Sequence, residues 1–166
     1  MDILDRLLKH DVWTTRQLLL RCRELTPQQF DQRFDAGPGS LRETFAHMIG
    51  NIEVWTDLMR GRPVRPDSEP KERAESVEGL IGRLDVAAVD FGSLARQIAD
   101  EGRSDELWTD VLDDPPTQKT FGGAVAHVIT HNMAHRSEVL HMLQRLGLQN
   151  LIEGDVLSWE KMEGRK

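Results

Sequence analysis

Histidine is the residue type whose spacing in this sequence points to chemistry. Three of the six histidines, His127, His131 and His135, follow one another at intervals of four residues. Residues four apart stack on one face of a helix, so neighbouring imidazoles of this run can reach the same metal ion. The run therefore predicts a metal site built on a helix.

A second helix must complete such a site, because two imidazoles alone do not hold a catalytic metal firmly. On a helical wheel, His135 and His131 point toward the apolar face of their helix, whereas His127 lies nearer its boundary. His47, in the middle of another apolar-periodic segment, is the leading candidate for the third ligand. The pattern thus predicts a site of His47, His131 and His135, with His127 left open as an alternative ligand.

Three neutral imidazoles would leave the charge of a divalent ion uncompensated and at least one coordination position open. Such a centre can lower the pKa of bound water or hold an anionic ligand such as a thiolate. A metalloprotease of the His-Glu-x-x-His kind is excluded, because Asn132 occupies the position of its general-base glutamate. The pattern leaves the ion open among Zn, Ni and Fe(II), since all three accept imidazole.

Other polar residues are better explained without a metal. His10 and His141 each fit an ordinary half-buried histidine with a neighbouring hydrogen-bond partner. For Arg136 we favour a surface or interhelical ion pair over a role in guiding an anionic substrate. For Asp11 and Glu138 we favour solvated charge over a role as outer acceptors of a ligand N–H.

The composition limits the class of protein. The chain has 166 residues and a formal net charge of −7, which suits one domain and argues against nucleic acid as the main partner. Its one cysteine, Cys22, excludes an internal disulfide framework and fits a small core side chain. No apolar run approaches the roughly 20 residues of a membrane span, and the acidic N-terminus does not resemble a signal peptide. We expect a soluble, cytoplasmic protein with one helical domain over residues 1–166.

Apolar residues recur at helical spacing in four segments, which predict helices over residues 2–24, 40–59, 76–100 and 121–146. Ser40 followed three residues later by Glu43 is the capping-box pattern of a helix start. Prolines mark residues 62–70 as a loop, and residues 102–120 are expected to be irregular with a short extended piece at 107–109. The tail, residues 149–166, contains Trp159, which we expect to anchor a core or an interface, like the other tryptophans. The fold class predicted is all-α, a four-helix bundle, and its long linker permits the second and third helices to run parallel.

The sequence resembles the DinB/YfiT-like family over nearly its whole length. The resemblance rests on a histidine within the second helix and on these segments: His10-Asp-Val-Trp13, His47 to Trp55, His131-Asn-Met-Ala-His135-Arg136, Leu146-Gly147 and Gly154-Asp155-Val-Leu. It implies an all-α four-helix bundle with long crossover connections of the up-down-down-up type, in a homodimer. It also implies one divalent metal ion (Zn, Ni or Fe) held by His47, His131 and His135, while His127 is not part of the family pattern.

The resemblance implies two kinds of activity. Members with known activity are thiol-dependent transferases or isomerases that use small bacterial thiols, others are expected to be metal-dependent hydrolases, and many have no known reaction; contact with DNA is not implied. The first hypothesis is therefore an S-transferase or isomerase in which the metal activates a low-molecular-weight thiol toward a small-molecule substrate. A hydrolase using a metal-bound hydroxide ranks second because the sequence offers no obvious general base. The third hypothesis is a non-enzymatic, metal-binding bundle of the stress response.

Overall fold

Four long helices make up most of the chain in the computed structural model, which describes residues 1–65 and 75–163. Each begins at a residue whose side chain accepts a hydrogen bond from the backbone three positions later, which satisfies one of the free N–H groups of the first turn. The helices are α1 (Ile3–Arg21), α3 (Leu41–Met59), α4 (Val77–Asp100) and α5 (Phe121–Arg145). The four helices predicted from hydrophobic periodicity are confirmed.

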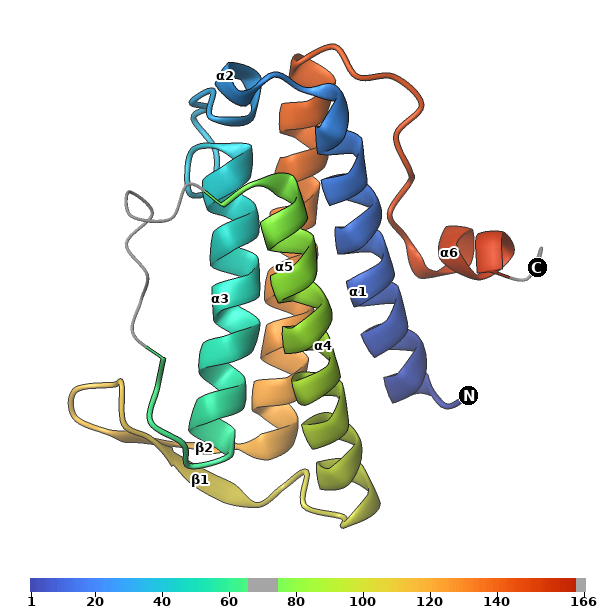
Figure 1. Cartoon of the computed structure of the whole chain (residues 1–166). Coiled ribbons are helices and arrows are strands. Elements are labelled where there is room, and N and C mark those ends of the chain that lie inside the picture. Colours follow the sequence, from blue (N-terminus) through green and yellow to red (C-terminus); the bar gives the residue numbers. More distant parts are fainter. Residues whose placement is uncertain (66–74, 164–166) are drawn as a thin grey trace.

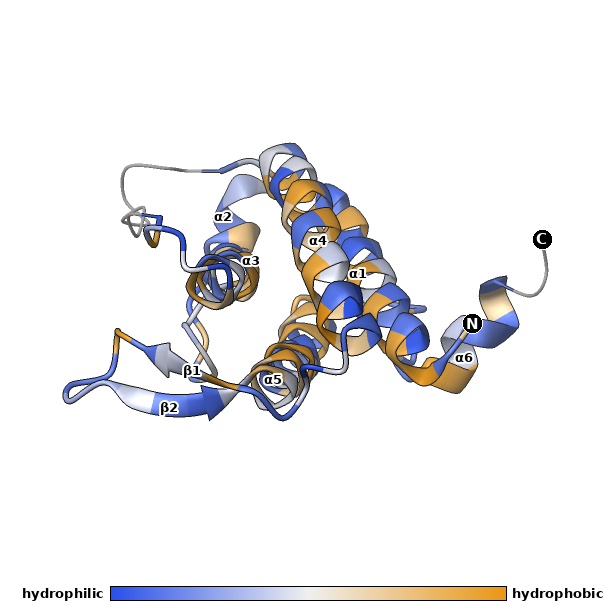
Figure 2. Cartoon of the chain, turned by 90° about the horizontal axis from the view of Figure 1, so that it is seen from below, coloured by the Kyte–Doolittle hydropathy of each residue, from blue (hydrophilic) through white to orange (hydrophobic). Residues whose placement is uncertain are grey.

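The helices run up, down, down and up in chain order, so α3 and α4 are parallel (Figure 1). Helix α1 packs against α4 and α5, and α3 packs against the same two helices. Seen from below, the four helices surround a common centre (Figure 2). The predicted all-α bundle with long crossovers is therefore confirmed. The predicted loop at 62–70 is described only to residue 65, and residues 62–65 have no regular structure.

The core is built from the apolar face of each long helix. Its fully buried side chains include Leu18, Phe45, Leu84 and Met142, one from each of the four. Cys22 is also buried, as expected of a core residue, and burial raises the pKa of its thiol well above the ordinary value. The thiol is therefore protonated at neutral pH and is not a nucleophile.

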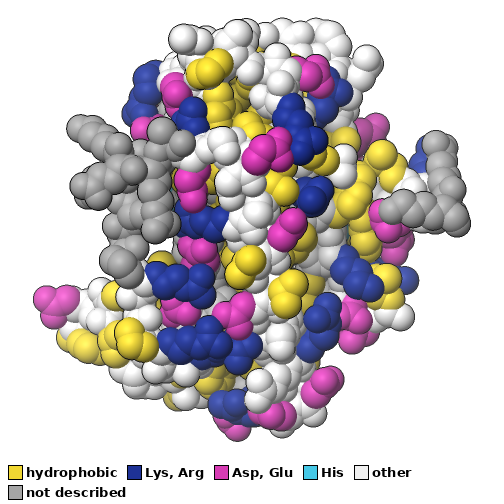
Figure 3. Space-filling view, viewed as in Figure 1, with side chains coloured by type: hydrophobic (Ala, Val, Ile, Leu, Met, Phe, Trp, Pro, Cys, Tyr) yellow, Lys and Arg dark blue, Asp and Glu magenta, His cyan; other side chains and the backbone are white. Residues whose placement is uncertain are grey.

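The face of the bundle that Figure 3 shows carries interspersed charges of both signs. Many form ion pairs between helices, such as Arg83 with Glu53 at 2.7 Å and Arg16 with Asp85 at 3.2 Å. None of the helices in the described part of the chain is long and apolar enough to span a membrane.

Short elements connect the long helices. A 3-10 turn, η1 (Cys22–Glu24), and a one-turn helix, α2 (Pro27–Phe30), follow α1. Strands β1 (Leu107–Asp110) and β2 (Thr117–Thr120) form an antiparallel hairpin in which Leu107 pairs with Thr120. The extended piece predicted at 107–109 is confirmed, but its partner strand was not predicted.

The C-terminal helix α6 (Val156–Glu163) packs against α1 and not against the bundle centre. Trp159 is buried there, with its ring centroid 6.1 Å from that of His10. His10 Nε2 donates a hydrogen bond to the carbonyl oxygen of Gly154 at 2.8 Å. Trp159 is thus an anchor, as predicted for the tryptophans, and it docks the tail on the bundle; His10 has an ordinary structural partner.

The burial of His10 predicts a pH dependence of stability. Burial lowers the pKa of His10 below its ordinary value, although the bond to Gly154 acts in the opposite direction. The unfolded chain keeps a histidine pKa of about 6.5, so it binds more protons than the folded chain just below that pH. The contribution of the neutral His10 ring to the free energy of unfolding is therefore present above pH ~6.5. It is lost as the pH falls toward the lower pKa of His10 in the folded protein.

We expect the free energy of unfolding to fall less between about pH 7.5 and pH 5.5 in His10→Gln than in the wild type. Glutamine can still donate to Gly154 but does not titrate. Urea titrations at the two pH values measure the difference. An identical fall in both proteins would contradict the lowered pKa of His10 in the folded protein.

Candidate metal centre

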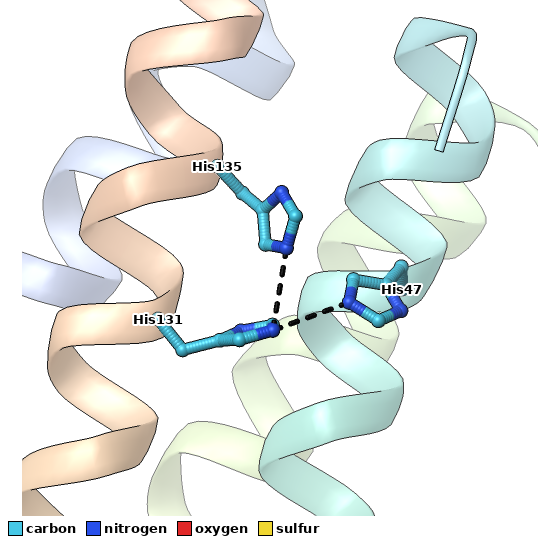
Figure 4. Close-up of side chains that lie close together, drawn as sticks. All are labelled: His47, His131 and His135. Atoms are coloured by element: carbon cyan, nitrogen blue, oxygen red, sulfur yellow. Dashed lines mark hydrogen bonds between the residues drawn. The ribbon is translucent and has the colours of Figure 1, made fainter. Parts of the chain in front are cut away.

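Two neighbouring helices bring three imidazoles together (Figure 4). His47 lies in α3, and His131 and His135 lie one turn apart on α5. His131 Nε2 is 3.3 Å from His47 Nε2 and 3.3 Å from His135 Nε2. All three potential ligand atoms lie within 4.8 Å of one another. The structure thus brings together the three histidines predicted from the sequence.

Two of the three separations between these nitrogens fit the geometry of a small divalent cation. Two imidazole nitrogens bound to a tetrahedral zinc ion at about 2.0–2.1 Å lie about 3.3–3.4 Å apart. The separations of His131 Nε2 from His47 Nε2 and from His135 Nε2 are both 3.3 Å. These three histidines could therefore hold a divalent metal ion, and they are the one such group of His, Cys, Asp and Glu in the described residues.

The electrostatics of the site keep His131 neutral. Burial and, to a smaller extent, the neighbouring imidazoles of His135, His47 and His127 together lower the pKa of His131 to about 4, although the side chain of Asn132 acts in the opposite direction. Its Nδ1 is buried without a hydrogen-bond partner. The ring is therefore neutral at neutral pH, and it can offer a nitrogen lone pair to a cation without net release of a proton.

Glu138 controls the orientation of His135. Its Oε2 accepts a hydrogen bond from His135 Nδ1 at 2.7 Å, three residues away on the same helix. A proton fixed on Nδ1 leaves Nε2 with its lone pair facing the other two histidines. The expectation that Glu138 is only a solvated charge is wrong, and its i+3 spacing from His135 was the signal that could have shown its role.

We predict that Glu138→Ala weakens the affinity for Zn²⁺ by about 10- to 100-fold, the usual cost of removing an outer partner of a metal ligand. Competition with a chromogenic chelator measures this affinity. Ser137→Ala is the matched control, because the Ser137 hydroxyl bonds only to its own helix, at the carbonyl oxygen of Met133. Equal zinc affinities for the two variants would show that Glu138 has no such role.

Behind the site, a buried ion pair joins α1 to α5. Arg136 Nη1 donates to Asp11 Oδ1, and Asn132 Nδ2 donates to Asp11 Oδ2 at 3.2 Å. All three side chains are buried. The interhelical ion pair predicted for Arg136 is confirmed, whereas Asp11 is neither a solvated charge nor bonded to a histidine ring.

His127 lies next to the triad but outside it. Its ring centroid is 5.5 Å from that of His131 and 4.8 Å from that of Trp55. It does not belong to the group of close ligand atoms. The remaining histidine on this helix, His141, is exposed.

A hollow of about 630 Å³ lies beside His47. One face of α3 forms its floor, and the loops before and after this helix and the hairpin contribute its walls. The lining includes Pro38, Asn51, Val54, Val64 and Leu112. This volume lies in the range of small-molecule sites. The conformation of these walls could not be derived from the sequence, because they come from segments far apart along the chain.

The fold and the site define a four-helix bundle with a three-histidine centre that could hold a divalent metal ion. The DinB family model matches residues 1–163, and the chain belongs to the DinB family. One similar protein is Protein DinB of Bacillus subtilis (strain 168), which is 22% identical over 156 residues, or 88% of this chain and 87% of that protein.

Proposed function

We propose that this chain is a metal-dependent enzyme of the thiol S-transferase or isomerase type. The observation that carries the proposal is the convergence of three imidazole nitrogens beside a hollow of small-molecule size. In this proposal His47, His131 and His135 are the metal ligands, and the ion is Zn, Ni or Fe.

A divalent ion at this centre would supply Lewis acidity, which lowers the pKa of a thiol that binds to it. The three histidines add no negative charge to the centre, so an anionic thiolate is favoured there. His47 is exposed, which leaves one side of the centre open to a small molecule. Glu138 holds His135 in the required tautomer through its bond to Nδ1.

The test is to load the protein with Zn²⁺, Ni²⁺ or Fe²⁺ and to measure the loss of free thiol with a panel of electrophiles. We expect loss of thiol that depends on the metal and disappears after chelation. Ester turnover without added thiol would instead support a hydrolase. Metal uptake without turnover of either kind would support a non-enzymatic metal-binding bundle.

We propose further that the protein is a cytoplasmic homodimer that acts on a small molecule. The resemblance to the DinB/YfiT-like family implies the dimer, and Val86 and Val89 on α4, which are 68% and 74% exposed, offer apolar surface to it. Light scattering coupled to size-exclusion chromatography measures the mass in solution. A mass of 18.9 kDa, that of one chain, would contradict the dimer.

A further inference from the structure

The loop between α2 and α3 is fixed against the end of α5. Phe34 is buried, and the guanidinium of Arg145 lies 5.0 Å from its ring centroid. Within the loop, the Phe34 N–H donates to the Gly39 carbonyl oxygen at 2.6 Å, and the Gly39 N–H donates to the Ala36 carbonyl oxygen at 3.1 Å. The residues between these anchors therefore have a defined position relative to α5.

Gly37, inside this loop, lies directly against the carboxylate of Glu138. A Cβ atom added at Gly37 would come within 2.9 Å of Glu138 Cδ, and closer still to Oε2. Real Cβ atoms essentially never approach another heavy atom so closely, so one of the two groups would have to move. The group free to move is the carboxylate, because it stands at the end of a flexible side chain.

Movement of this carboxylate has a specific consequence. The oxygen that a Cβ would displace, Glu138 Oε2, is the one that accepts from His135 Nδ1 at 2.7 Å. Without this acceptor, the proton of the neutral His135 ring is free to reside on Nε2. A protonated Nε2 has no lone pair to offer to a cation.

We infer that Gly37 is a positioning residue of the metal centre. Its lack of a side chain lets the Glu138 carboxylate reach His135 Nδ1, and the carboxylate in turn keeps the His135 Nε2 lone pair directed at His47 and His131. The inference rests on the proposed role of these three histidines as ligands. It assigns to the α2–α3 loop a part in metal affinity.

Backbone conformation is the competing reason for a glycine here, since Gly37 has a φ of +50°. Gly61 provides a matched control, because it has a φ of +65° and, among the described residues beyond its own chain neighbours, no heavy atom lies within 4 Å of an added Cβ. Alanine at either position introduces a similar backbone strain, but only at Gly37 does it meet the carboxylate. Asparagine tolerates positive φ better than alanine and still carries a Cβ, so it separates contact from strain.

The experiment uses two readouts on each variant. The first is zinc affinity, measured by competition with a chelator. The second is the imidazole ¹⁵N spectrum of the metal-free protein at about pH 8, which reports the tautomer of neutral His135. We expect Gly37→Ala and Gly37→Asn each to lower zinc affinity about tenfold and to convert His135 from the Nδ1–H tautomer to a mixture. Gly61→Ala and Gly61→Asn should leave both readouts unchanged.

A double variant tests whether Gly37 affects zinc affinity through the Glu138 carboxylate. In a Glu138→Ala background, Gly37→Ala should have no further effect on zinc affinity, because the carboxylate it displaces is already absent. Equal effects at Gly37 and Gly61, or a full additional loss in the double variant, would overturn the inference. If wild-type protein bound no zinc, the proposed function would fail, while the ¹⁵N spectra of the metal-free variants would still decide whether Gly37 sets the His135 tautomer.

Discussion

Replacing His131 by alanine is expected to abolish tight binding of Zn²⁺. His131 Nε2 is the central atom of the group, 3.3 Å from the Nε2 atoms of both His47 and His135. The two remaining imidazoles cannot form a three-ligand site, so the loss should exceed the roughly 10- to 100-fold cost of losing an outer partner. Isothermal titration of the metal-free protein with Zn²⁺ measures both affinity and stoichiometry.

The same helix offers the controls for this prediction. His141→Ala removes an exposed imidazole outside the group of close ligand atoms and should bind zinc like the wild type. His127→Ala should also retain one zinc per chain, because His127 packs on Trp55 and lies outside the group of close ligand atoms. Retention of wild-type affinity by His131→Ala would contradict the proposed ligand set.

Breaking the ion pair between Asp11 and Arg136 is expected to cause the largest loss of stability. The two side chains are only 6% and 4% exposed, so each would be left as an uncompensated buried charge by removal of the other. Such a change costs about 3–5 kcal/mol. We therefore expect Arg136→Ala to lower the free energy of unfolding by this amount in urea titrations of the metal-free protein.

An exposed ion pair on the same helix α1 is the control. Arg16 pairs with Asp85 at 3.2 Å, with side chains 41% and 48% exposed. Arg16→Ala should cost less than about 1 kcal/mol, because water solvates both charges and screens their attraction. Similar losses for Arg136→Ala and Arg16→Ala would show that the buried pair does not hold α1 against α5.

The four helices of the bundle could be predicted because the sequence signals of each helix lie within the helix itself and at its first residues. Each long helix carries an apolar stripe and begins at a polar side chain that caps it, as Ser40 caps α3. The predicted capping box at this helix is only half formed, since the Glu43 carboxylate bonds to Arg33 and to the Ser40 hydroxyl and not back to the Ser40 backbone. The complete capping box lies at α2, between Thr26 and Gln29. The hairpin was missed because its second strand has no apolar alternation and is defined by pairing with β1.

The three histidines could be predicted from their spacing, but their surroundings could not. His131 and His135 are brought together by the helix itself, and His47 was chosen from its place on a second helix. The partner of His135, Glu138, was misjudged because exposed glutamates on helices are usually solvated. Gly37 has no sequence signal at all, because its importance depends on how closely a loop 100 residues away approaches the Glu138 carboxylate.

X-ray absorption at the zinc edge, on protein loaded with one equivalent of Zn²⁺, examines the ligand set most directly. A centre formed by His47, His131 and His135 predicts three imidazole nitrogens at about 2.0–2.1 Å from the ion. It also predicts that His47→Ala loses one of these imidazoles or all of the zinc. A wild-type spectrum with one imidazole or none, or one left unchanged by His47→Ala, would contradict the convergence of α3 and α5 on a single metal ion.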